Sequence, residues 1–230
     1  MLQKLLGPLR EFGPFAGFVY GLDRVLQSLS PRTRLFLHDL MVQPIPDRPL
    51  LSPGLAKGYE FREVARGAPE VDRMPARPDI KESRFRQGAR CLGVYRKGDF
   101  IGFIWFAFGR YEEDEVRCTY ELIPGAESVF DFDIYLFPEH RMGLGFVATW
   151  HGANEFLRAR GIRYTFSRLT RFNVASRRAH DHLGWKRIAS ALYVQLGDLQ
   201  VMFATMRPFI AASFGESRVR LTLAPAVLRA

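Results

Sequence analysis

Apolar residues recur at helical spacing over the first thirty residues of the chain. A first series, spaced three or four positions apart, comprises Leu2, Leu5, Leu6, Leu9 and Phe12. After a break at Gly13-Pro14, a second series comprises Phe15, Phe18, Val19, Leu22, Val25, Leu26 and Leu29. Because residues at this spacing share one face of a helix, and proline interrupts a helix interior, the pattern predicts two amphipathic helices.

A proline-rich stretch separates this region from the rest of the chain. Residues 42–54 read VQPIPDRPLLSPG, and clusters of Pro, Gly and Asp are typical of connections. We therefore expect an amphipathic helical N-terminal extension over residues 1–45, followed by a linker at about residues 42–54.

From residue 57 onwards, short strand patterns and longer helical patterns follow one another. The expected strands are residues 59–67, 90–111 (two strands that turn at Lys97-Gly98-Asp99), 116–125, 128–139, 162–169, 186–196 and 199–206. The expected helices are residues 69–88, which are broken, 143–160 and 173–184. This order predicts a mixed α/β (α+β) domain over residues 57–207. Residues 208–230 form a C-terminal tail that could add a strand.

Composition narrows the class of protein. The chain has 230 residues, 47% of them hydrophobic, which is enough to bury a sizeable core. No apolar run approaches 18 residues, and the N-terminus has no signal-peptide pattern. Cys91 and Cys118 are isolated, which predicts reduced thiols, no structural metal and a cytoplasmic protein.

The charge favours an anionic partner. The formal net charge is +9, which suits nucleic acid, a membrane surface or a phosphate-bearing cofactor. The arginines are dispersed and lie in no recognised nucleic-acid motif, so nucleic acid is the least favoured of the three.

Two glycines stand where one predicted helix begins. Residues 140–146 read HRMGLGF and join the strand at 128–139 to the helix at 143–160. Without side chains at Gly143 and Gly145, the N–H groups of the first helical turn can approach a ligand closely. These donors and the helix dipole favour a pyrophosphate. The alternative is an ordinary tight turn.

A second motif gives this turn a context. Residues 173–185 read NVASRRAHDHLGW and predict a short helix that stops at Gly184. Together the two motifs resemble the GNAT superfamily of acyl-CoA N-acyltransferases. That superfamily has R/Q-x-x-G-x-G/A after its fourth strand and N-x-x-A/S-x-x-x-Y-x-x-x-G-F/W on a later helix. The resemblance covers roughly residues 57–207 and implies a GNAT-type acyltransferase fold.

The resemblance also implies the residues that bind acetyl-CoA or another acyl-CoA as co-substrate, mainly through backbone contacts. They are Leu136, Phe137, His140, Arg141, Met142, Gly143, Leu144, Gly145, Phe146, Asn173, Ser176 and Arg177. His140 takes the first motif position in place of Arg or Gln, with Arg141 as the alternative counterpart. The basic side chains that could meet the phosphates are Arg141, Arg171, Arg177 and Arg178.

His180 stands where many GNAT members carry a tyrosine that protonates the departing CoA thiolate. Imidazole can donate a proton near neutral pH, so His180 could be this general acid. The alternative is a packing substitution in an enzyme that needs no such acid.

Candidate bases lie on the strand before the glycine turn. Asp131, Asp133 and Tyr135 alternate with apolar residues, so we expect them to share one face of the strand. Buried carboxylates are costly unless they are used or paired, and proximity between the two could raise the pKa of one towards that of a working base. The alternative is that one carboxylate pairs with an arginine and the other binds backbone, and Glu121 on the preceding strand is a competing base.

Residues 111–115, YEEDE, predict a solvated hairpin tip that could also attract a cationic acceptor. The sequence as a whole predicts an enzyme that transfers an acyl group, most simply acetyl, from CoA to a primary amine. The alternatives are a long-chain N-acyl amino acid synthase and a non-catalytic acyl-CoA or membrane-surface binding module. We expect the N-terminal helices to pack on the catalytic domain, to form a homodimer contact, or to touch the inner face of a membrane.

Overall fold

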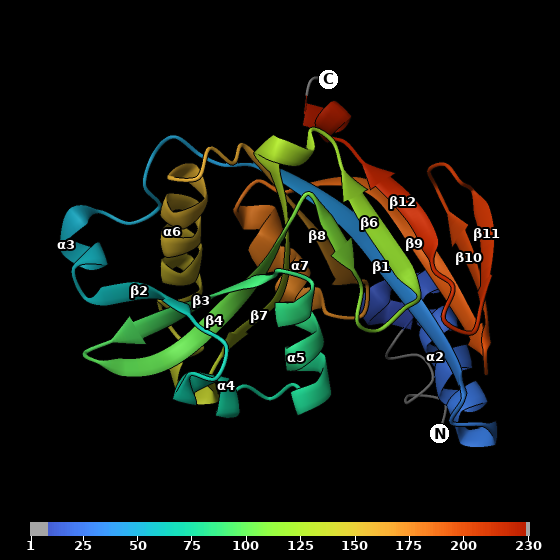
Figure 1. The fold of residues 1–230 in the computed structure, drawn as a ribbon. Helices are drawn as coiled ribbons and strands as arrows, with labels where there is room; N and C mark the ends of the chain where they lie inside the picture. Colours follow the sequence, from blue (N-terminus) through green and yellow to red (C-terminus); the bar gives the residue numbers. More distant parts are fainter. Residues whose placement is uncertain (1–8, 229–230) are drawn as a thin grey trace. The chain divides into compact units, whose positions relative to one another are not determined.

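The computed structural model describes residues 9–228, which form helices and strands in the order seen in Figure 1. The helices are α2 (Pro14–Leu29), α3 (Pro53–Ala56), α4 (Pro69–Asp72), α5 (Pro78–Arg86), α6 (Gly145–Arg158) and α7 (Val174–His182). The strands are β1 (Thr33–Pro44), β2 (Tyr59–Val64), β3 (Arg90–Arg96), β4 (Asp99–Phe108), β5 (Arg110–Glu112), β6 (Cys118–Leu122), β7 (Ser128–Leu136), β8 (Tyr164–Thr170), β9 (Lys186–Leu196), β10 (Leu199–Ala204), β11 (Ile210–Phe214) and β12 (Val219–Leu223). Three short 3-10 turns are η1 (Gly125–Glu127), η2 (Pro138–His140) and η3 (Pro225–Leu228).

The chain forms two compact units. The first comprises Met1–Gln43, Glu112–Glu121 and Phe166–Ala230, and the second comprises Pro44–Tyr111 and Leu122–Thr165. Strand β8 begins in the second unit and ends in the first. Each unit is described by itself below.

The first unit is built on antiparallel strands in the order β11-β10-β9-β1. On one face of these strands, Tyr193 and Gln200 are buried. The Tyr193 hydroxyl lies 3.5 Å from the hydroxyl of Tyr120 on β6. The side-chain oxygen of Gln200 accepts a hydrogen bond from the amide of Arg117 at 2.8 Å. The other face is covered by α2, whose Ala16 and Val19 form a cluster with Leu35 and Leu37 of β1.

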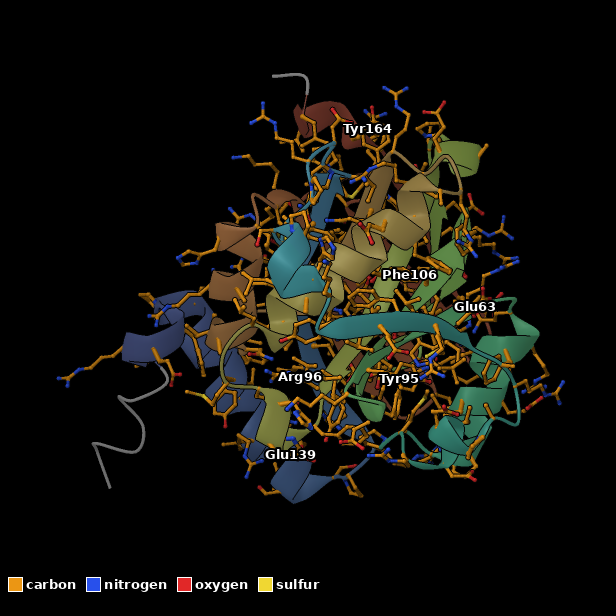
Figure 2. The ribbon with its side chains drawn as sticks, turned by 90° about the vertical axis from the view of Figure 1, so that its left-hand side faces the viewer. Glu63, Tyr95, Arg96, Phe106, Glu139 and Tyr164 are labelled. Carbon is orange, nitrogen blue, oxygen red and sulfur yellow. The ribbon has the colours of Figure 1, made fainter. Side chains whose placement is uncertain are left out.

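The second unit is built on antiparallel strands in the order β7-β4-β3-β2, and α6 covers part of their surface. Its core includes a cluster of Val94, Ile101 and Leu136, against which Phe146 at the start of α6 packs. Figure 2 shows this unit from the side of β2, with Glu63 on that strand. Glu63 pairs with Arg90 at 3.2 Å and with Arg160 at 3.3 Å.

Most of the predicted elements are confirmed from residue 59 onwards, and α2 confirms the second of the two predicted N-terminal helices. The first predicted helix extends into residues 1–8, which lie outside the described residues, although residues 9–12 are helical. The expected helical extension over residues 1–45 is wrong for residues 33–44, because these form β1, which pairs with β9. Its burial explains the difference, since Leu37, Leu40 and Val42 are core residues of a strand.

The connecting and C-terminal segments also have defined structure. No helix or strand covers residues 45–52, as the proline-rich sequence predicts. The C-terminal tail adds two strands, β11 and β12, where one was expected. Among residues 9–228, no helix is long and apolar enough to cross a membrane.

Candidate functional site

The connection between β7 and α6 is compact because of its glycines. Gly143 has a φ of 87°, and a Cβ built there would meet no atom within 4 Å. A Cβ at Gly145 would lie 2.5 Å from the carbonyl oxygen of His140, which is too close for any other residue without movement of the backbone. Gly145 is therefore required by the close approach of His140, and Gly143 is favoured by its positive φ and faces open space.

The start of α6 is accessible. Met142, Gly143 and Leu144 are exposed, and Met142 keeps 89% of its surface. Leu144 is the N-cap residue and makes no side-chain cap hydrogen bond, and the first N–H groups of any α-helix lack intrahelical partners. The helix dipole adds positive potential at the same place. The site therefore suits an anionic group such as a phosphate.

Arg141 fixes this connection to the end of β7. Its Nε donates to the carbonyl of Leu136 at 2.9 Å, and its guanidinium lies 5.2 Å from the centre of the Tyr135 ring. The amide of His140 donates to the carbonyl of Phe137 at 2.8 Å. The backbone donors at the start of α6 are thus held by contacts within the connection.

Strand β7 carries one extra residue relative to β4. Trp105 pairs with Phe132 and Phe103 with Tyr135, so two steps along β4 match three along β7. Asp133 lies at this bulge and has a φ of 48°. Because one extra residue reverses the alternation of faces beyond it, the prediction that Asp131, Asp133 and Tyr135 share one face is wrong.

Both carboxylates of β7 have partners within their own unit. Asp131 is buried and accepts a hydrogen bond from Thr165 Oγ1 at 2.6 Å. Asp133 is paired with the buried guanidinium of Arg84, which also lies over the rings of Trp105 and Phe132. Asp133 has the arginine partner of the structural alternative, and Asp131 has a threonine hydroxyl where that alternative expected backbone. A role as base stays a prediction.

Leu136 and Phe137 are two of the residues predicted to contact acyl-CoA through their backbone. The Phe137 amide donates to the carbonyl of Ile101 at 3.0 Å, so it is already engaged. The bulge at Asp133 is a second source of donors, because an extra residue in a strand leaves the ladder. Strict alternation of Asp and Phe in the sequence gave no sign of this bulge.

The second motif begins α7 in the first unit. Asn173 is the N-cap residue, and its Oδ1 accepts the amide of Ser176 at 3.0 Å. The spacing N-x-x-S is thus explained by capping. The side-chain oxygen of Asn173 is used within the helix, and contact with the pantetheine arm stays a prediction.

His180 is buried at the end of α7 against Trp185, with ring centres 5.2 Å apart. Its Nδ1 lies 2.7 Å from the carbonyl oxygen of Ser176. Because a carbonyl only accepts, Nδ1 carries the proton in this contact. Burial lowers the pKa of His180 below its usual value. The neutral imidazole therefore keeps its proton on Nδ1, which favours the packing alternative.

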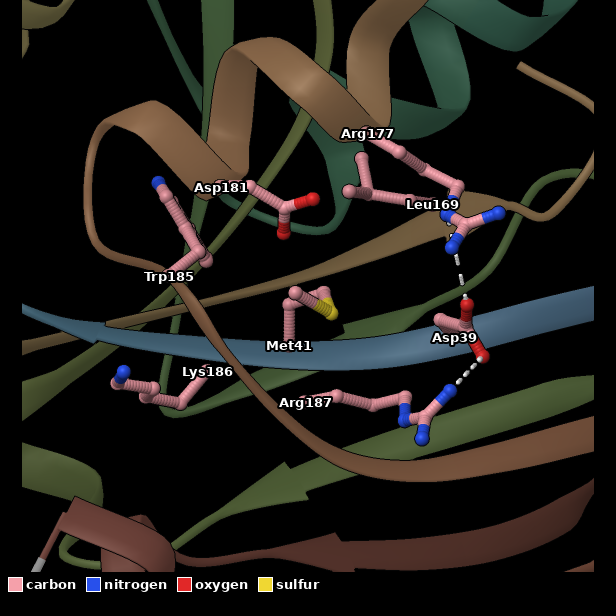
Figure 3. Close-up of a pocket in the computed structure, with 8 residues that line it drawn as sticks. All are labelled: Asp39, Met41, Leu169, Arg177, Asp181, Trp185, Lys186 and Arg187. Carbon is pink, nitrogen blue, oxygen red and sulfur yellow. Dashed lines mark ion pairs between the residues drawn. The ribbon is translucent and has the colours of Figure 1, made fainter. Parts of the chain in front are cut away.

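A cavity of about 210 Å³ lies beside α7 in the first unit. Figure 3 shows Asp39 of β1 between Arg177 of α7 and Arg187 of β9, at 3.9 Å and 3.8 Å. Asp39 is buried and also bonds Arg171 at 2.6 Å and Ser190 at 2.7 Å. Burial opposes ionisation of Asp39, but the hydrogen bonds from Arg171 and Ser190 and the arginine charges lower its pKa overall.

Two of the residues predicted to meet the phosphates pair with Asp39 instead. Arg171 holds Asp39, and Arg177 is drawn towards the same carboxylate. Sequence reasoning missed Asp39 because it assigned residues 33–44 to a helical extension. The sequence signal for Asp39 was an acidic residue between apolar residues that the structure buries, namely Leu37, Leu40, Met41 and Val42.

The expected hairpin tip at residues 111–115 is not wholly solvated. Glu113 is 1% exposed and accepts two hydrogen bonds from the Arg168 guanidinium, at 2.8 Å and 3.0 Å. Although burial opposes ionisation, the Arg168 charge leads the effects that lower the pKa of Glu113. The prediction failed at Glu113 because its partner on β8 is 55 residues away in the sequence.

The remaining predicted residues are in different surroundings. Glu121 lies on β6, in the sheet that includes β12, and is 4.0 Å from Arg220. Arg178 is exposed on α7. Over residues 9–228, no group of three His, Cys, Asp or Glu side chains could hold a metal ion.

The sequence matches no family model and no curated protein. Among solved structures, the chain is similar to a protein from Novosphingobium aromaticivorans assigned to the GNAT acetyltransferase family, with 15% identity, 72% of this chain and 66% of that chain covered, and a TM-score of 0.50. A functionally unknown conserved protein from Staphylococcus epidermidis has 9% identity, coverage of 76% and 67%, and a TM-score of 0.49. A GCN5-related N-acetyltransferase from Kribbella flavida has 14% identity, coverage of 76% and 63%, and a TM-score of 0.45.

This chain spans about two thirds of the length of each of these three structures. Likeness at such low identity shows the fold and not the activity. The chain has the mixed α/β fold of GNAT acetyltransferases, with an N-terminal helix, as the two sequence motifs predicted.

Proposed function

We propose that this protein is an acyl-CoA-dependent N-acyltransferase that moves an acyl group, most simply acetyl, to a primary amine. The observation that carries the proposal is the glycine connection between β7 and α6, in which Met142, Gly143 and Leu144 are exposed directly before a helix start without a side-chain cap. Within a GNAT-type fold, these donors suit the pyrophosphate of CoA.

Transfer forms a C–N bond, breaks the thioester C–S bond, and moves one proton from the amine to the thiolate or to solvent. In the proposal, backbone N–H groups at the β7 bulge polarise the thioester carbonyl. Asp131 or Asp133 accepts the amine proton, directly or through water, and Glu121 stays the competing base. The thiolate takes its proton from solvent or from a group other than neutral His180.

A second candidate is a non-catalytic module that binds acyl-CoA without turnover. Two observations favour it: Asp131 and Asp133 each have a structural partner, and His180 keeps its proton on Nδ1. A long-chain N-acyl amino acid synthase would share the same CoA contacts and differ in the acyl group that it accepts.

Calorimetry with CoA, acetyl-CoA and palmitoyl-CoA, followed by thiol-release assays with a panel of primary amines, tests these candidates. Binding of acetyl-CoA together with amine-dependent thiol release supports the transferase. Binding without release for any amine supports the module, and preference for palmitoyl-CoA supports the synthase. Absence of binding to all three ligands contradicts the proposal.

A further inference from the structure

One face of the sheet in the first unit is apolar well beyond the helix that covers it. The antiparallel registers place Leu35 opposite Val194 and Leu37 opposite Leu192, on the strands β1 and β9. These four side chains meet Ala16 and Val19 of α2. Helix α2 therefore covers this face over β1 and β9.

The same face continues over β10 and β11, where no helix among residues 9–228 covers it. Val194 pairs with Val201, and Leu192 with Phe203, so these rows extend onto β10. The further pairs on this face are Leu199–Phe214, Val201–Ala212 and Phe203–Ile210. Phe214 is 69% exposed, Ile210 66% and Phe203 45%. These six residues of β10 and β11 are called the uncovered sheet face below.

Helix α2 also has a second apolar side, which faces away from β1. Its members are exposed and follow helical spacing: Phe15, Phe18, Leu22, Val25 and Leu29. We call them the outer stripe. Successive residues of an α-helix are rotated by about 100° around its axis. This rotation places the outer stripe on one side of the buried residues Ala16 and Val19, and Tyr20 on their other side.

The flank with Tyr20 identifies which way the outer stripe faces. Tyr20 stacks edge-on against Phe172, which follows β8, at 5.3 Å. Because β8 and β9 lie on opposite sides of β1, the outer stripe lies on the side of α2 towards β9 and β10. It therefore borders the uncovered sheet face, and Figure 1 shows β10 and β11 beyond β9 at this end of the strand order.

Strand β11 lacks the usual protection of an edge strand. Within the part of the chain that the structure describes, β11 is last in its strand order, and its residues Ile-Ala-Ala-Ser-Phe carry no charge. By contrast β2, the last strand in the second unit, exposes the charged side chains Glu60, Arg62 and Glu63. Exposed apolar edges without charges promote pairing with another chain.

We propose that a second copy of this chain covers this surface, so that the outer stripe of each subunit packs on the uncovered sheet face of its partner. A two-fold axis makes such contacts reciprocal, and each chain carries both halves. The side chains of the two halves expose on the order of 1,000 Å² of apolar surface, given about 200 Å² for a whole phenylalanine side chain. This compares with roughly 800 Å² per partner in a standard interface.

The charges favour a second copy over a lipid surface. Strands β10 and β11 contain no charged residue, and the charged residues of α2 are the buried Asp23 and the exposed Arg24, which lie outside the outer stripe. Arg32, near the end of α2, is already paired with Asp198 at 3.0 Å. A surface for anionic lipid would combine apolar and unpaired basic side chains, whereas aromatic residues without charges are typical of an interface core.

Light scattering after size exclusion tests the inference on the full chain, and it does not depend on acyl transfer. The wild type should have twice the monomer mass of 26.4 kDa at micromolar concentration. Phe18→Glu and Phe214→Glu should each be monomeric, with the dimer weakened at least about 100-fold, because each buries a carboxylate in an apolar contact. Leu55→Glu, which changes an exposed apolar residue of α3, should stay dimeric.

Mixing the two variants tests which halves meet. The mixture should recover part of the dimer, because one of its two contacts then has wild-type residues on both sides. No recovery would overturn the pairing of stripe with sheet face.

Further outcomes would overturn the proposal as a whole. These are a monomeric wild type, with or without binding to phosphatidylserine vesicles, and a dimer that both variants leave unchanged. Circular dichroism checks that the variants fold. If one of the variants does not fold, the test becomes hydrogen exchange of the wild type at two protein concentrations. Protection of residues 15–29 and 210–214 should rise with concentration. Equal protection at both concentrations contradicts the proposal.

Discussion

Helices α6 and α7 both begin with a GNAT-like motif, yet their first turns are filled in opposite ways. At α7 the Asn173 side chain accepts the Ser176 amide at 3.0 Å. At α6 the N-cap is Leu144, which makes no side-chain cap hydrogen bond, and the residues before it are exposed glycine and methionine. The N–H groups of a helix start are available to a ligand only where the chain does not cap them.

The two histidines of these motifs differ in the same sense. His140 lies in the exposed connection before α6, whereas His180 is buried and bonded to the carbonyl of Ser176. The residues before α6 are therefore open to solvent, whereas the first turn of α7 is capped by its own chain. The following variants test that division.

The largest effect is expected at Gly145. In Gly145→Ala, the new Cβ would meet the His140 carbonyl at 2.5 Å, so the connection must move and its N–H groups must turn away from the anion. We expect acetyl-CoA affinity, measured by calorimetry, to fall at least about 100-fold, since several charge-assisted hydrogen bonds are lost together.

Gly21→Ala is the matched control for Gly145→Ala. Gly21 lies in α2 with no atom within 4 Å of a built Cβ, so this change should leave affinity unaltered. If folded Gly145→Ala binds acetyl-CoA like the wild type, the start of α6 is not the site.

Arg141 should have the next largest effect. Its Nε holds the connection to the Leu136 carbonyl, and removing one charged hydrogen bond costs about 1.5–3 kcal/mol when it is fully used. We expect Arg141→Ala to weaken acetyl-CoA binding about tenfold. Arg178→Ala, on exposed α7, removes the same charge and should change affinity less than twofold. Equal losses in both variants would mean that charge matters and the anchor does not.

The sequence predicted the fold better than it predicted the contacts of its polar side chains. Periodicity and turn residues predicted α2, α6, α7, β2 to β4 and β6 to β10, because these signals are local. Strand β1 was missed, since a continuously buried strand has no alternation to mark it. The bulge at Asp133 and the partners of Asp39 and Glu113 were missed because they depend on pairing between distant strands.

A smaller effect, on stability alone, is expected at Asn173. Asn173→Ala removes the cap of α7 and should lower the free energy of unfolding by about 1 kcal/mol in urea titrations. Asn173→Asp keeps a capping oxygen and should be close to the wild type. Affinity for acetyl-CoA should change less than about twofold in both. A large loss of affinity in the stable Asp variant would show that the side-chain nitrogen binds the ligand.

The smallest effect is expected at His180. The neutral ring bonds Ser176 through Nδ1–H and packs on Trp185, so it has no Nε2 proton to give. Because burial lowers the pKa of His180, the folded chain binds the second proton of this imidazole more weakly than the unfolded chain does. Protonation thus favours unfolding as pH falls from about 6.5 towards the lowered value.

His180→Phe keeps the bulk of the ring, so kcat with an accepted amine should stay within about threefold of the wild type across neutral pH, against about 100-fold or more for a lost general acid. The exposed His182→Phe is the control and should behave alike. A tenfold drop in kcat at unchanged KM for His180→Phe alone, partly restored by His180→Tyr, would instead make His180 the proton donor. Both helices would then take part in acyl transfer, and the contrast between α6 and α7 would not hold.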